Sequence, residues 1–469
     1  MATHGPTARK SLAALAGTGG PRGFAKTLGP WSITAMGVGA VIGAGIFVLT
    51  GTAAARYAGP AVTLSFVLGG VACAFVGLCY AELAAMLPVS GSSYSYTYAS
   101  LGEIFAWIVG WDLVLEYAAG AATVAVGWST YAVSLLGDAG LALSPRLAAG
   151  PMNLPAATVV LAITGLLALG TKGSSRFNNA IVAVKLAVVV AFVGFGAFAV
   201  SPAHWRPFLP PNAGAFGHFG PSGVLRGASV VFFAFIGFDA VSTAAQEARR
   251  PQRDMPIGIL GSLALCTLLY VAVAGVLTGL VPYGELDVAD PIAKGVEAIG
   301  RAWLSLPVKL GALAGLTTVM LVLLYGQGRI LYTVARDGLL PPVFGRLHPR
   351  FGTPVASQLT VGAGVALAAA LVPIGVLGEM VSIGTLLAFA LVCFAVVRLR
   401  RTDPGAERAF RCPAVPLVPA CGILCCFALM AGLPWLTWAR LVVWLAIGLA
   451  IYFGYGRRHS TLDRPGGAP

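Results

Sequence analysis

Long apolar runs separated by short polar connections make up nearly the whole chain. A helix needs about 20 predominantly apolar residues to cross a bilayer, and runs of suitable length and character occupy residues 30–55, 60–87, 102–136, 155–171, 177–200, 223–247, 256–281, 305–336, 356–373, 376–399, 413–433 and 436–455. The connections leave no room for a soluble domain, and the longest, 281–304, is polar enough to cover one mouth of the protein as a lid. We therefore expect an all-α polytopic membrane protein with twelve transmembrane helices.

The composition strengthens this expectation, since 58% of the residues are hydrophobic and only 10% are charged. Soluble domains typically contain about 25% charged residues and about 45–50% apolar ones. The 61 glycines and 30 prolines interrupt the apolar runs without a repeating period, which helical membrane proteins tolerate.

The formal net charge of +13 comes from 30 basic and 17 acidic residues, and its distribution is informative. Twenty basic residues fall in segments on the side of the two termini, and six fall in segments on the other side. Because the cytoplasmic segments of membrane proteins are enriched in Lys and Arg, we expect both termini in the cytoplasm and the protein in the plasma (inner) membrane. No basic stripe interleaved with aromatic residues indicates a nucleic-acid partner.

Catalytic and metal chemistry find little support in the sequence. All five histidines lie in termini or connections, and neither a GxSxG nor an HExxH string is present. The eight cysteines fall mostly within apolar runs and lack paired CxxC spacing, which is typical of packing residues. We expect no enzyme activity, no catalytic residue, no metal and no cofactor.

The first apolar run contains Gly37-Val-Gly39-Ala-Val-Ile-Gly43-Ala-Gly45, which places four glycines in the middle of a span. Close helix packing through the GxxxG pair Gly39 and Gly43 is one explanation. The other is that the helix unwinds at 43–45 and exposes main-chain N–H groups that bind a carboxylate. On this second interpretation the carboxylate site comprises Ile42, Gly43, Ala44, Gly45 and Ile46.

The sixth run also has a glycine and a carboxylate in mid-span, in Phe232-Phe-Ala-Phe-Ile-Gly-Phe-Asp239. If the chain has two five-helix halves, the first and sixth spans occupy matching positions, and interrupted helices at such positions indicate a binding site. Asp239 is either a gating residue or a structural carboxylate that caps the second half-helix. Freed carbonyls in this run would bind the ammonium group of a zwitterion, and the candidates are Phe233, Ala234, Phe235 and Ile236.

Lys185 lies about two turns inside the fifth run. A lysine at that depth is costly and by default marks a functional position. Desolvation lowers the proton affinity of a lysine, so one hypothesis is that Lys185 loses and regains a proton during a transport cycle. The alternative is a permanently charged tether that binds carbonyl groups of the first span.

Other polar or bulky residues in the third and eighth spans are candidates for the side-chain pocket and for a gate. Glu116 either faces the substrate side chain or pairs internally, while Leu323 and Leu324 supply bulk in the eighth span. Arg329, near the inner end of the eighth span, is interpreted as a gating or helix-end residue.

Several ordered motifs together resemble the cationic amino acid transporter branch of the amino acid–polyamine–organocation superfamily. The matching segments are Gly43-Ala-Gly-Ile-Phe47, Tyr80-Ala-Glu-Leu83, Pro88-Val-Ser-Gly-Ser-Ser-Tyr-Ser-Tyr-Thr-Tyr98, Leu101-Gly-Glu103, Gly110-Trp-Asp-Leu-Val-Leu-Glu-Tyr117, Gly237-Phe-Asp239, Pro251-Gln-Arg-Asp-Met-Pro256 and Ala335-Arg-Asp-Gly338. The resemblance implies a LeuT-like fold with discontinuous helices one and six. Its parts would be a cytoplasmic segment 1–29, a five-helix repeat 30–200, an inverted repeat 223–399, two added helices 413–455 and a cytoplasmic tail 456–469.

The resemblance also implies secondary transport of an amino acid by alternating access, with protons as the coupling ion in bacterial members and Lys185 matching their fifth-span lysine. Two departures bear on the substrate. Phe235 stands where tyrosine is common, and the pair 323–324 replaces a smaller Gly-Ser pair of eukaryotic arginine and lysine carriers. Because added bulk shortens a pocket, we expect a small neutral L-amino acid. A cationic amino acid or polyamine exchanger and a non-transporting amino acid sensor stay open, and the oligomeric state is not indicated.

Overall fold

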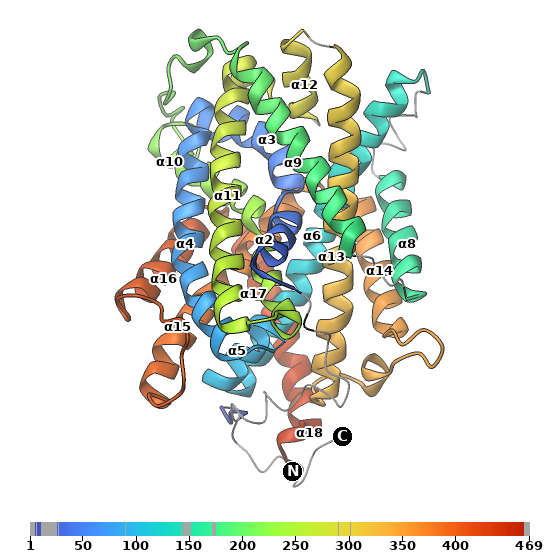
Figure 1. Cartoon of the computed structure of the whole chain (residues 1–469), viewed down its shortest axis with the longest axis vertical. Coiled ribbons are helices and arrows are strands. Elements are labelled where there is room, and N and C mark those ends of the chain that lie inside the picture. The colour runs from blue at the N-terminus through green and yellow to red at the C-terminus, as the bar shows by residue number, and fades with distance from the viewer. Residues whose placement is uncertain are drawn as a thin grey trace.

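The computed structural model describes residues 5, 7–10, 26, 28–89, 91–141, 144, 152–170, 175–288, 290–300 and 302–463. These residues form helices joined by short connections (Figure 1), and the only β pairing among them is an isolated bridge between Leu28 and Ala248. Most of the expected segment 1–29 and the end of the expected tail, 464–469, lie outside the described residues.

Eight helical segments among the described residues are long and apolar enough to cross a membrane. They are Gly45–Met86, which ends in α4 (Val62–Met86); α6 (Glu103–Asp138); Ala180–Ala197, within α9 (Ser175–Ala197); Gly220–Glu247, which begins with α10 (Gly220–Val231); α11 (Pro251–Leu280); α13 (Ser305–Arg336); α15 (Ile374–Thr402); and Trp435–His459, which begins with α17 (Trp435–Ile451). Three shorter apolar helices are α8 (Leu154–Ala168), α14 (Val355–Leu371) and α16 (Leu417–Ala431). The protein is therefore a polytopic helical membrane protein, while the count of twelve spans stays a prediction.

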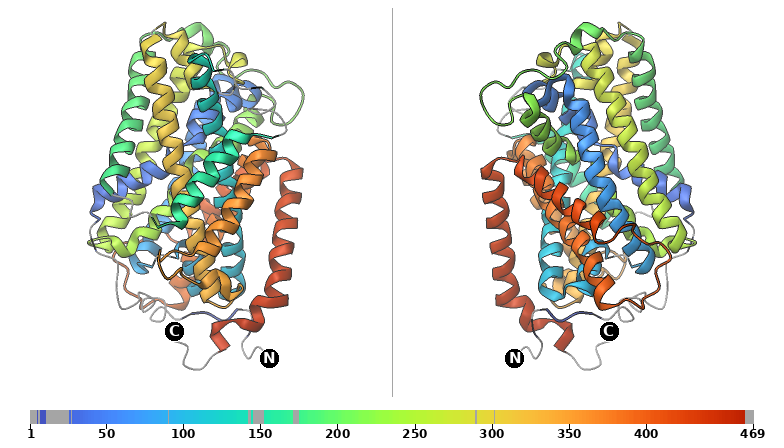
Figure 2. Two further views of the ribbon diagram at one scale, coloured as in Figure 1. Left: turned by 90° about the vertical axis from the view of Figure 1, so that its right-hand side faces the viewer. Right: turned by 90° about the vertical axis from the view of Figure 1, so that its left-hand side faces the viewer.

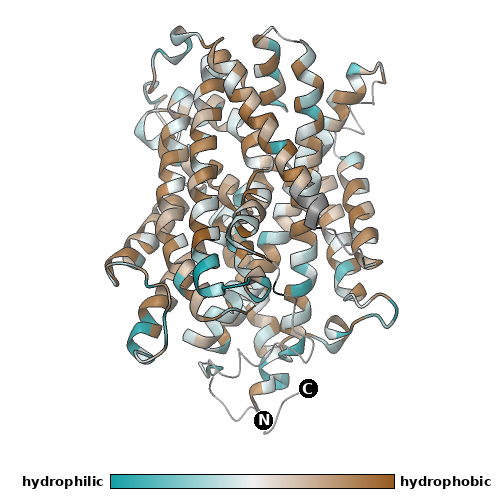
Figure 3. Cartoon of the chain, in the orientation of Figure 1, coloured by the Kyte–Doolittle hydropathy of each residue, from teal (hydrophilic) through white to brown (hydrophobic). Residues whose placement is uncertain are grey.

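The outer surface of the bundle is apolar over its middle. On α4, for example, Leu64, Leu68 and Val71 are exposed, and hydropathic colouring shows apolar residues along most helices with polar ones concentrated toward the two ends (Figure 3). A helix that is hydrophobic on all sides suits a lipid environment. The exposed leucines and valines are thus lipid-facing positions.

Helix α6 lies at the centre of the packing and contacts α13, α14 and α15, while α11 packs against α4 and α2 (Pro30–Val41). At one end of the bundle, which we call the terminal face, residues 7–10 and 457–463 approach α5 (Ser92–Ser100) and the beginning of α6. At the opposite end lies α12 (Pro291–Ala298), and we call this end the α12 face (Figures 1 and 2).

Two carboxylates, the half-buried Asp337 and the buried Glu103, hold the chain ends at the terminal face. Asp337 accepts hydrogen bonds from Lys10 (2.6 Å) and from the Tyr94 hydroxyl (2.7 Å). Glu103 accepts hydrogen bonds from the hydroxyls of Tyr98, Tyr452 and Ser460. Burial and the neighbouring carboxylates raise the pKa of Tyr94 and Tyr98 well above the ordinary value, so both hydroxyls stay protonated donors at neutral pH.

The structure differs from the expected boundaries in three places. Helix α11 begins at Pro251, five residues before the expected span, and contains Pro256 in its interior. The connection 281–304 contains α12, and the motif after residue 87 contains α5, neither of which was expected as a helix. Both helices are shorter than ten residues, and α5 is rich in serine and tyrosine, so neither stood out as a run of about 20 apolar residues.

Candidate functional site

The first interruption of a helix follows α2. Helix α2 ends at Val41, Ile42 is extended with ψ 101°, and a π-helical turn follows at Gly45–Leu49. The break therefore lies at residues 42–43, slightly before the expected position 43–45. N–H groups at the start of a helix have no preceding helical carbonyl to bind, so this break directs main-chain donors toward its surroundings.

Two of the glycines lie in close packing contacts, and a third lies in the unwound turn. A Cβ atom on Gly39 would lie 2.8 Å from Val182 of α9, and one on Gly45 would overlap Ala234. Close packing thus explains these two glycines, whereas the unwound geometry is at Ile42 and Gly43.

The second interruption lies between α10 and residue 247. A 3₁₀ turn covers Phe232–Phe235, Ile236 is extended, and a second 3₁₀ segment covers Asp239–Glu247. Between them Gly237 has φ +108°, and a Cβ atom there would lie 3.0 Å from the carbonyl oxygen of Ala40. A residue other than glycine is strained at this φ, so Gly237 fixes the place where the two interrupted helices meet.

One tyrosine of α11 binds both interruptions. The Tyr270 hydroxyl lies 2.8 Å from the carbonyl oxygen of Val41 and 2.8 Å from that of Ala234. A hydroxyl has a single proton to donate, so it serves one carbonyl at a time. This role could not be predicted from the sequence, because one tyrosine in an apolar run follows no pattern.

A small cavity lies between the two interruptions, α6 and α13. Every side chain that lines it is apolar, and polar groups reach it only from the main chain. The lining residues are Ala40, Val41, Gly43, Ala44, Gly45, Gly120, Val124, Phe233, Ile236, Val319 and Leu323. Five of these residues were not expected from the sequence, because they carry no distinguishing residue type: Ala40, Val41, Gly120, Val124 and Val319.

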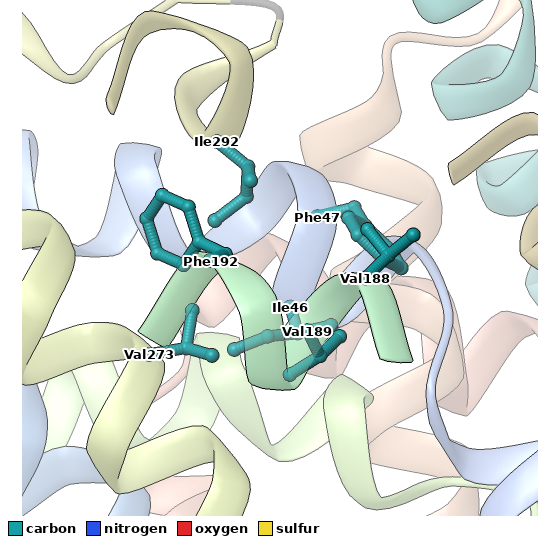
Figure 4. A pocket seen from close by; sticks show the side chains of 7 residues that line it. All are labelled: Ile46, Phe47, Val188, Val189, Phe192, Val273 and Ile292. Carbon is teal, nitrogen blue, oxygen red and sulfur yellow. The ribbon is translucent and has the colours of Figure 1, made fainter. Parts of the chain in front are cut away.

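A second pocket, toward the α12 face, is separate and wholly apolar (Figure 4). It is lined by Ile46, Phe47, Val188, Val189, Phe192, Val273 and Ile292. The Ile46 side chain therefore points into this second pocket, and only its main chain is available to the expected carboxylate site.

Lys185 is fully buried and donates hydrogen bonds to the carbonyl oxygens of Gly39 and Ile42 (3.1 Å for the latter). Its aliphatic chain approaches α13, where a Cβ atom on Gly315 would lie 3.3 Å from Cδ. The ammonium group thus lies at the C-terminal end of α2, where free carbonyls favour a cation. Lys185 therefore lies between the first, fifth and eighth expected spans.

Several expected site residues lie outside the cavity. The Phe235 ring packs against Phe66 and Tyr270, with ring centroids 6.4 and 5.4 Å apart. Leu324 is buried, and its carbonyl oxygen accepts a hydrogen bond from Gln358 (3.1 Å). Arg329 lies over the Tyr325 ring, 4.4 Å from its centroid.

The two expected carboxylates are buried beside the cavity. Glu116 lies one helical turn from the lining residue Gly120, and Asp239 accepts a hydrogen bond from the main-chain N–H of Gly237 (3.3 Å). Asp239 therefore caps the turn at the second interruption, and Glu116 is not among the residues that line the cavity.

Two interrupted helices that face each other across a buried cavity are the arrangement in which membrane carriers bind small solutes. The chain belongs to the amino acid permease family, whose model matches residues 28–455. It is 46% identical to the branched-chain amino acid permease BcaP of Bacillus subtilis (strain 168) over 460 residues, which cover 96% of this chain and 97% of that protein.

Two further relatives are named for other substrates. The methylthioribose transporter of Bacillus subtilis (strain 168) is 43% identical over 463 residues, covering 97% of this chain and 99% of the transporter. The cationic amino acid transporter 4 of Homo sapiens is 31% identical over 561 residues, covering 93% of this chain and 88% of the human protein. The resemblance to amino acid transporters inferred from the sequence motifs is thus confirmed, and the chain is an amino acid permease.

Proposed function

We propose that this permease takes up a small neutral L-amino acid by alternating access, driven by protons. The observation that carries the proposal is the cavity between the two interrupted helices, which offers main-chain polar groups at one side and only apolar side chains at the other. A zwitterion with an aliphatic side chain matches that division.

The two charged groups of the substrate would bind the main chain. The carboxylate would accept hydrogen bonds from N–H groups of residues 43–46, at the start of the resumed helix. The ammonium group would donate to the carbonyls of Phe233, Ala234 and Ile236, because a carbonyl has two lone pairs and can accept a second hydrogen bond. Phe233 already accepts one from the N–H of Ile236 (3.2 Å), and Ala234 accepts one from Tyr270 (2.8 Å).

The remaining walls favour a short aliphatic side chain. Val124, Val319 and Leu323 line the cavity, and a Cβ atom on Gly120 would lie 3.3 Å from a methyl group of Leu323. No carboxylate side chain lines the cavity among the described residues, so a guanidinium or a second ammonium group would be desolvated there without a partner. The related protein BcaP is named a branched-chain amino acid permease, which agrees with an aliphatic substrate.

Lys185 is proposed as the proton-coupling residue. Its ammonium group holds two carbonyls at the end of α2, next to the break that would bind the carboxylate. Loss of its proton would make the amine neutral and so weaken its hydrogen bonds to those carbonyls, which join α9 to α2. Protonation would in this way be linked to movement of the first interrupted helix. A permanently charged tether is the competing role.

The remaining expectations complete the proposal. Twelve spans in a LeuT-like arrangement would comprise the repeats 30–200 and 223–399 and the added pair 413–455, with both termini in the cytoplasm of a cell whose plasma (inner) membrane holds the protein. The terminal face would then be the cytoplasmic face, and the segment with α12 would cover the outer mouth.

Uptake by purified protein in proteoliposomes tests the proposal. Radiolabelled alanine, leucine, arginine and methylthioribose are compared, each with and without an inward proton gradient. We expect leucine or alanine to be accumulated and the gradient to stimulate accumulation. Robust arginine uptake that is not inhibited by alanine or leucine would reverse the substrate assignment. Equal uptake with and without the gradient would show that transport is not coupled to protons.

A further inference from the structure

Unpartnered polar atoms are concentrated in one buried region between the cavity and the terminal face. The region is bounded by α4, α5, α6, the segment Asp239–Glu247 and α15. The buried side-chain oxygens that lack a hydrogen-bond partner there belong to Tyr80, Ser93, Tyr96, Asp112, Glu116, Tyr117, Asp239, Ser382 and Thr385. Buried polar groups in folded proteins are almost always hydrogen-bonded, so such a concentration requires an explanation.

Three of these groups are carboxylates, and we call Asp112, Glu116 and Asp239 the carboxylate cluster. Each is at most 1% exposed. Both oxygens of Asp112, one of Glu116 and one of Asp239 have no partner. No ion pair between the cluster and a described basic residue is present.

Asp112 and Glu116 lie one turn apart on α6, and Asp239 is within electrostatic range of Glu116. Glu116 interacts electrostatically with Asp239 and Asp112, and Tyr80 and Tyr117 interact with both Glu116 and Asp239. Tyr80 contacts Phe238 edge to face, with ring centroids 5.6 Å apart, which places its ring beside the second interruption. On the opposite side, Asp112 packs closely against α15, since a Cβ atom on Gly384 would lie 2.7 Å from Oδ1 of Asp112.

The position of the cluster relative to the cavity is set by α6. This helix begins at Glu103 on the terminal face, and Gly120 lines the cavity. Glu116 and Asp112 therefore follow Gly120 at intervals of one turn, about 6 Å each, in the direction of the terminal face. Asp239 follows directly on the interruption whose carbonyls would bind the ammonium group.

We propose that the carboxylate cluster is a release subsite that receives the ammonium group of the departing amino acid on the side of the terminal face. This inference rests on the proposed function. An ammonium group has three donors, and carboxylate and hydroxyl oxygens are the acceptors that the region offers without partners. An ammonium group that leaves the carbonyls of 233–236 meets Asp239 and Glu116 first and Asp112 one turn further on, so the step out of the cavity keeps the cation paired.

Sided transport measurements test the subsite. Leucine exchange is measured at equal pH in right-side-out and inside-out vesicles from expressing cells, and the half-saturating leucine concentration is determined at each face. We expect Glu116→Gln and Asp239→Asn to raise this concentration about tenfold at the terminal face and less than twofold at the α12 face. Asp138→Asn is the matched control, because Asp138 lies at the other end of α6 and pairs with Lys309; it should leave the terminal-face value unchanged.

Thr385→Val removes one hydroxyl beside Glu116, keeps all three carboxylates and has nearly the same shape, so it tests the subsite even if a carboxylate variant does not fold. We expect a smaller increase, about threefold, again at the terminal face only. An equal increase at both faces, no increase in any variant, or unchanged half-saturation with loss of the response to a proton gradient would each overturn the subsite. Absence of leucine exchange in the unmodified protein would instead count against the proposed substrate.

Discussion

Trp111 and Trp444 each donate an indole N–H to the main-chain carbonyl of the other, at 2.9 and 3.1 Å, and their rings stack with centroids 4.5 Å apart. This reciprocal pair joins α6 to α17, which lies at the edge of the bundle (Figure 2). Trp107 adds a hydrogen bond to the carbonyl of Gly448 (2.8 Å), and a Cβ atom on Gly448 would overlap Trp111. The contact between these helices therefore depends on indole donors and on one glycine.

Replacing Trp444 by phenylalanine should weaken the attachment of α17. The change keeps an aromatic ring but removes the donor to Trp111, and one lost hydrogen bond between membrane helices corresponds to about 1 kcal/mol. We expect a lower Tm of the purified protein in detergent. Trp435→Phe is the control on the same helix, since Trp435 is 78% exposed; an equal fall in Tm for both variants would argue against the pair.

Gly237→Ala should disturb the second interruption. The variant residue would adopt φ near +108° and approach the carbonyl of Ala40, a strain of about 1–3 kcal/mol. We expect a lower Tm and a loss of most substrate uptake. Gly364→Ala in α14 is the matched control, because a Cβ atom there has no neighbour within 4 Å. Unchanged uptake by Gly237→Ala would show that this geometry is dispensable.

Lys185→Ala should separate coupling from binding. If Lys185 carries the proton, exchange of leucine across the membrane continues, while the stimulation of uptake by an inward proton gradient disappears. Lys309→Ala removes a basic residue paired with Asp138 near the α12 face and should keep the stimulation. If the gradient response persists in Lys185→Ala, the coupling role is removed and the tether to the carbonyls of Gly39 and Ile42 remains.

Leu323→Ala should lengthen the cavity. Leu323 lines it next to Gly120, and the loss of several methyl or methylene groups changes substrate discrimination by about 10- to 200-fold per methylene-sized difference. We expect uptake of longer substrates to rise at least tenfold relative to alanine in competition assays. Leu324→Ala is the control, because Leu324 is equally buried but outside the cavity; the same shift in both variants would show that helix stability, and not cavity length, sets the preference.

The sequence predicted the bundle well because crossing a bilayer requires long apolar runs, which are visible residue by residue. It also located both interruptions, since glycines in the middle of a span are conspicuous. The break after α2 begins at Ile42, before the expected residues 43–45. Gly39 and Gly45 pack closely against Val182 and Ala234, and such partners from distant segments cannot be identified from the local sequence.

Neighbouring positions on a helix were harder to distinguish. Leu323 and Leu324 are identical residues about 100° apart around α13, and only the former reaches the cavity. Similarly, the sequence left open whether Glu116 faces a substrate or pairs internally, because its depth in the span does not show which neighbours surround it. In the structure Glu116 is buried one turn from Gly120 on α6. Tyr270, which contacts both interruptions, lies in the apolar part of α11, where no residue pattern marks it.

The attachment of both chain ends to Asp337 and Glu103 has a practical consequence for work with this permease. Lys10, Tyr452 and Ser460 bind carboxylates that lie at the mouth of the terminal face. An affinity tag or fluorescent fusion at either end is therefore attached close to residues that bind α5, α6 and the segment after α13. Transport rates from tagged protein should be compared with those of protein from which the tag has been cleaved.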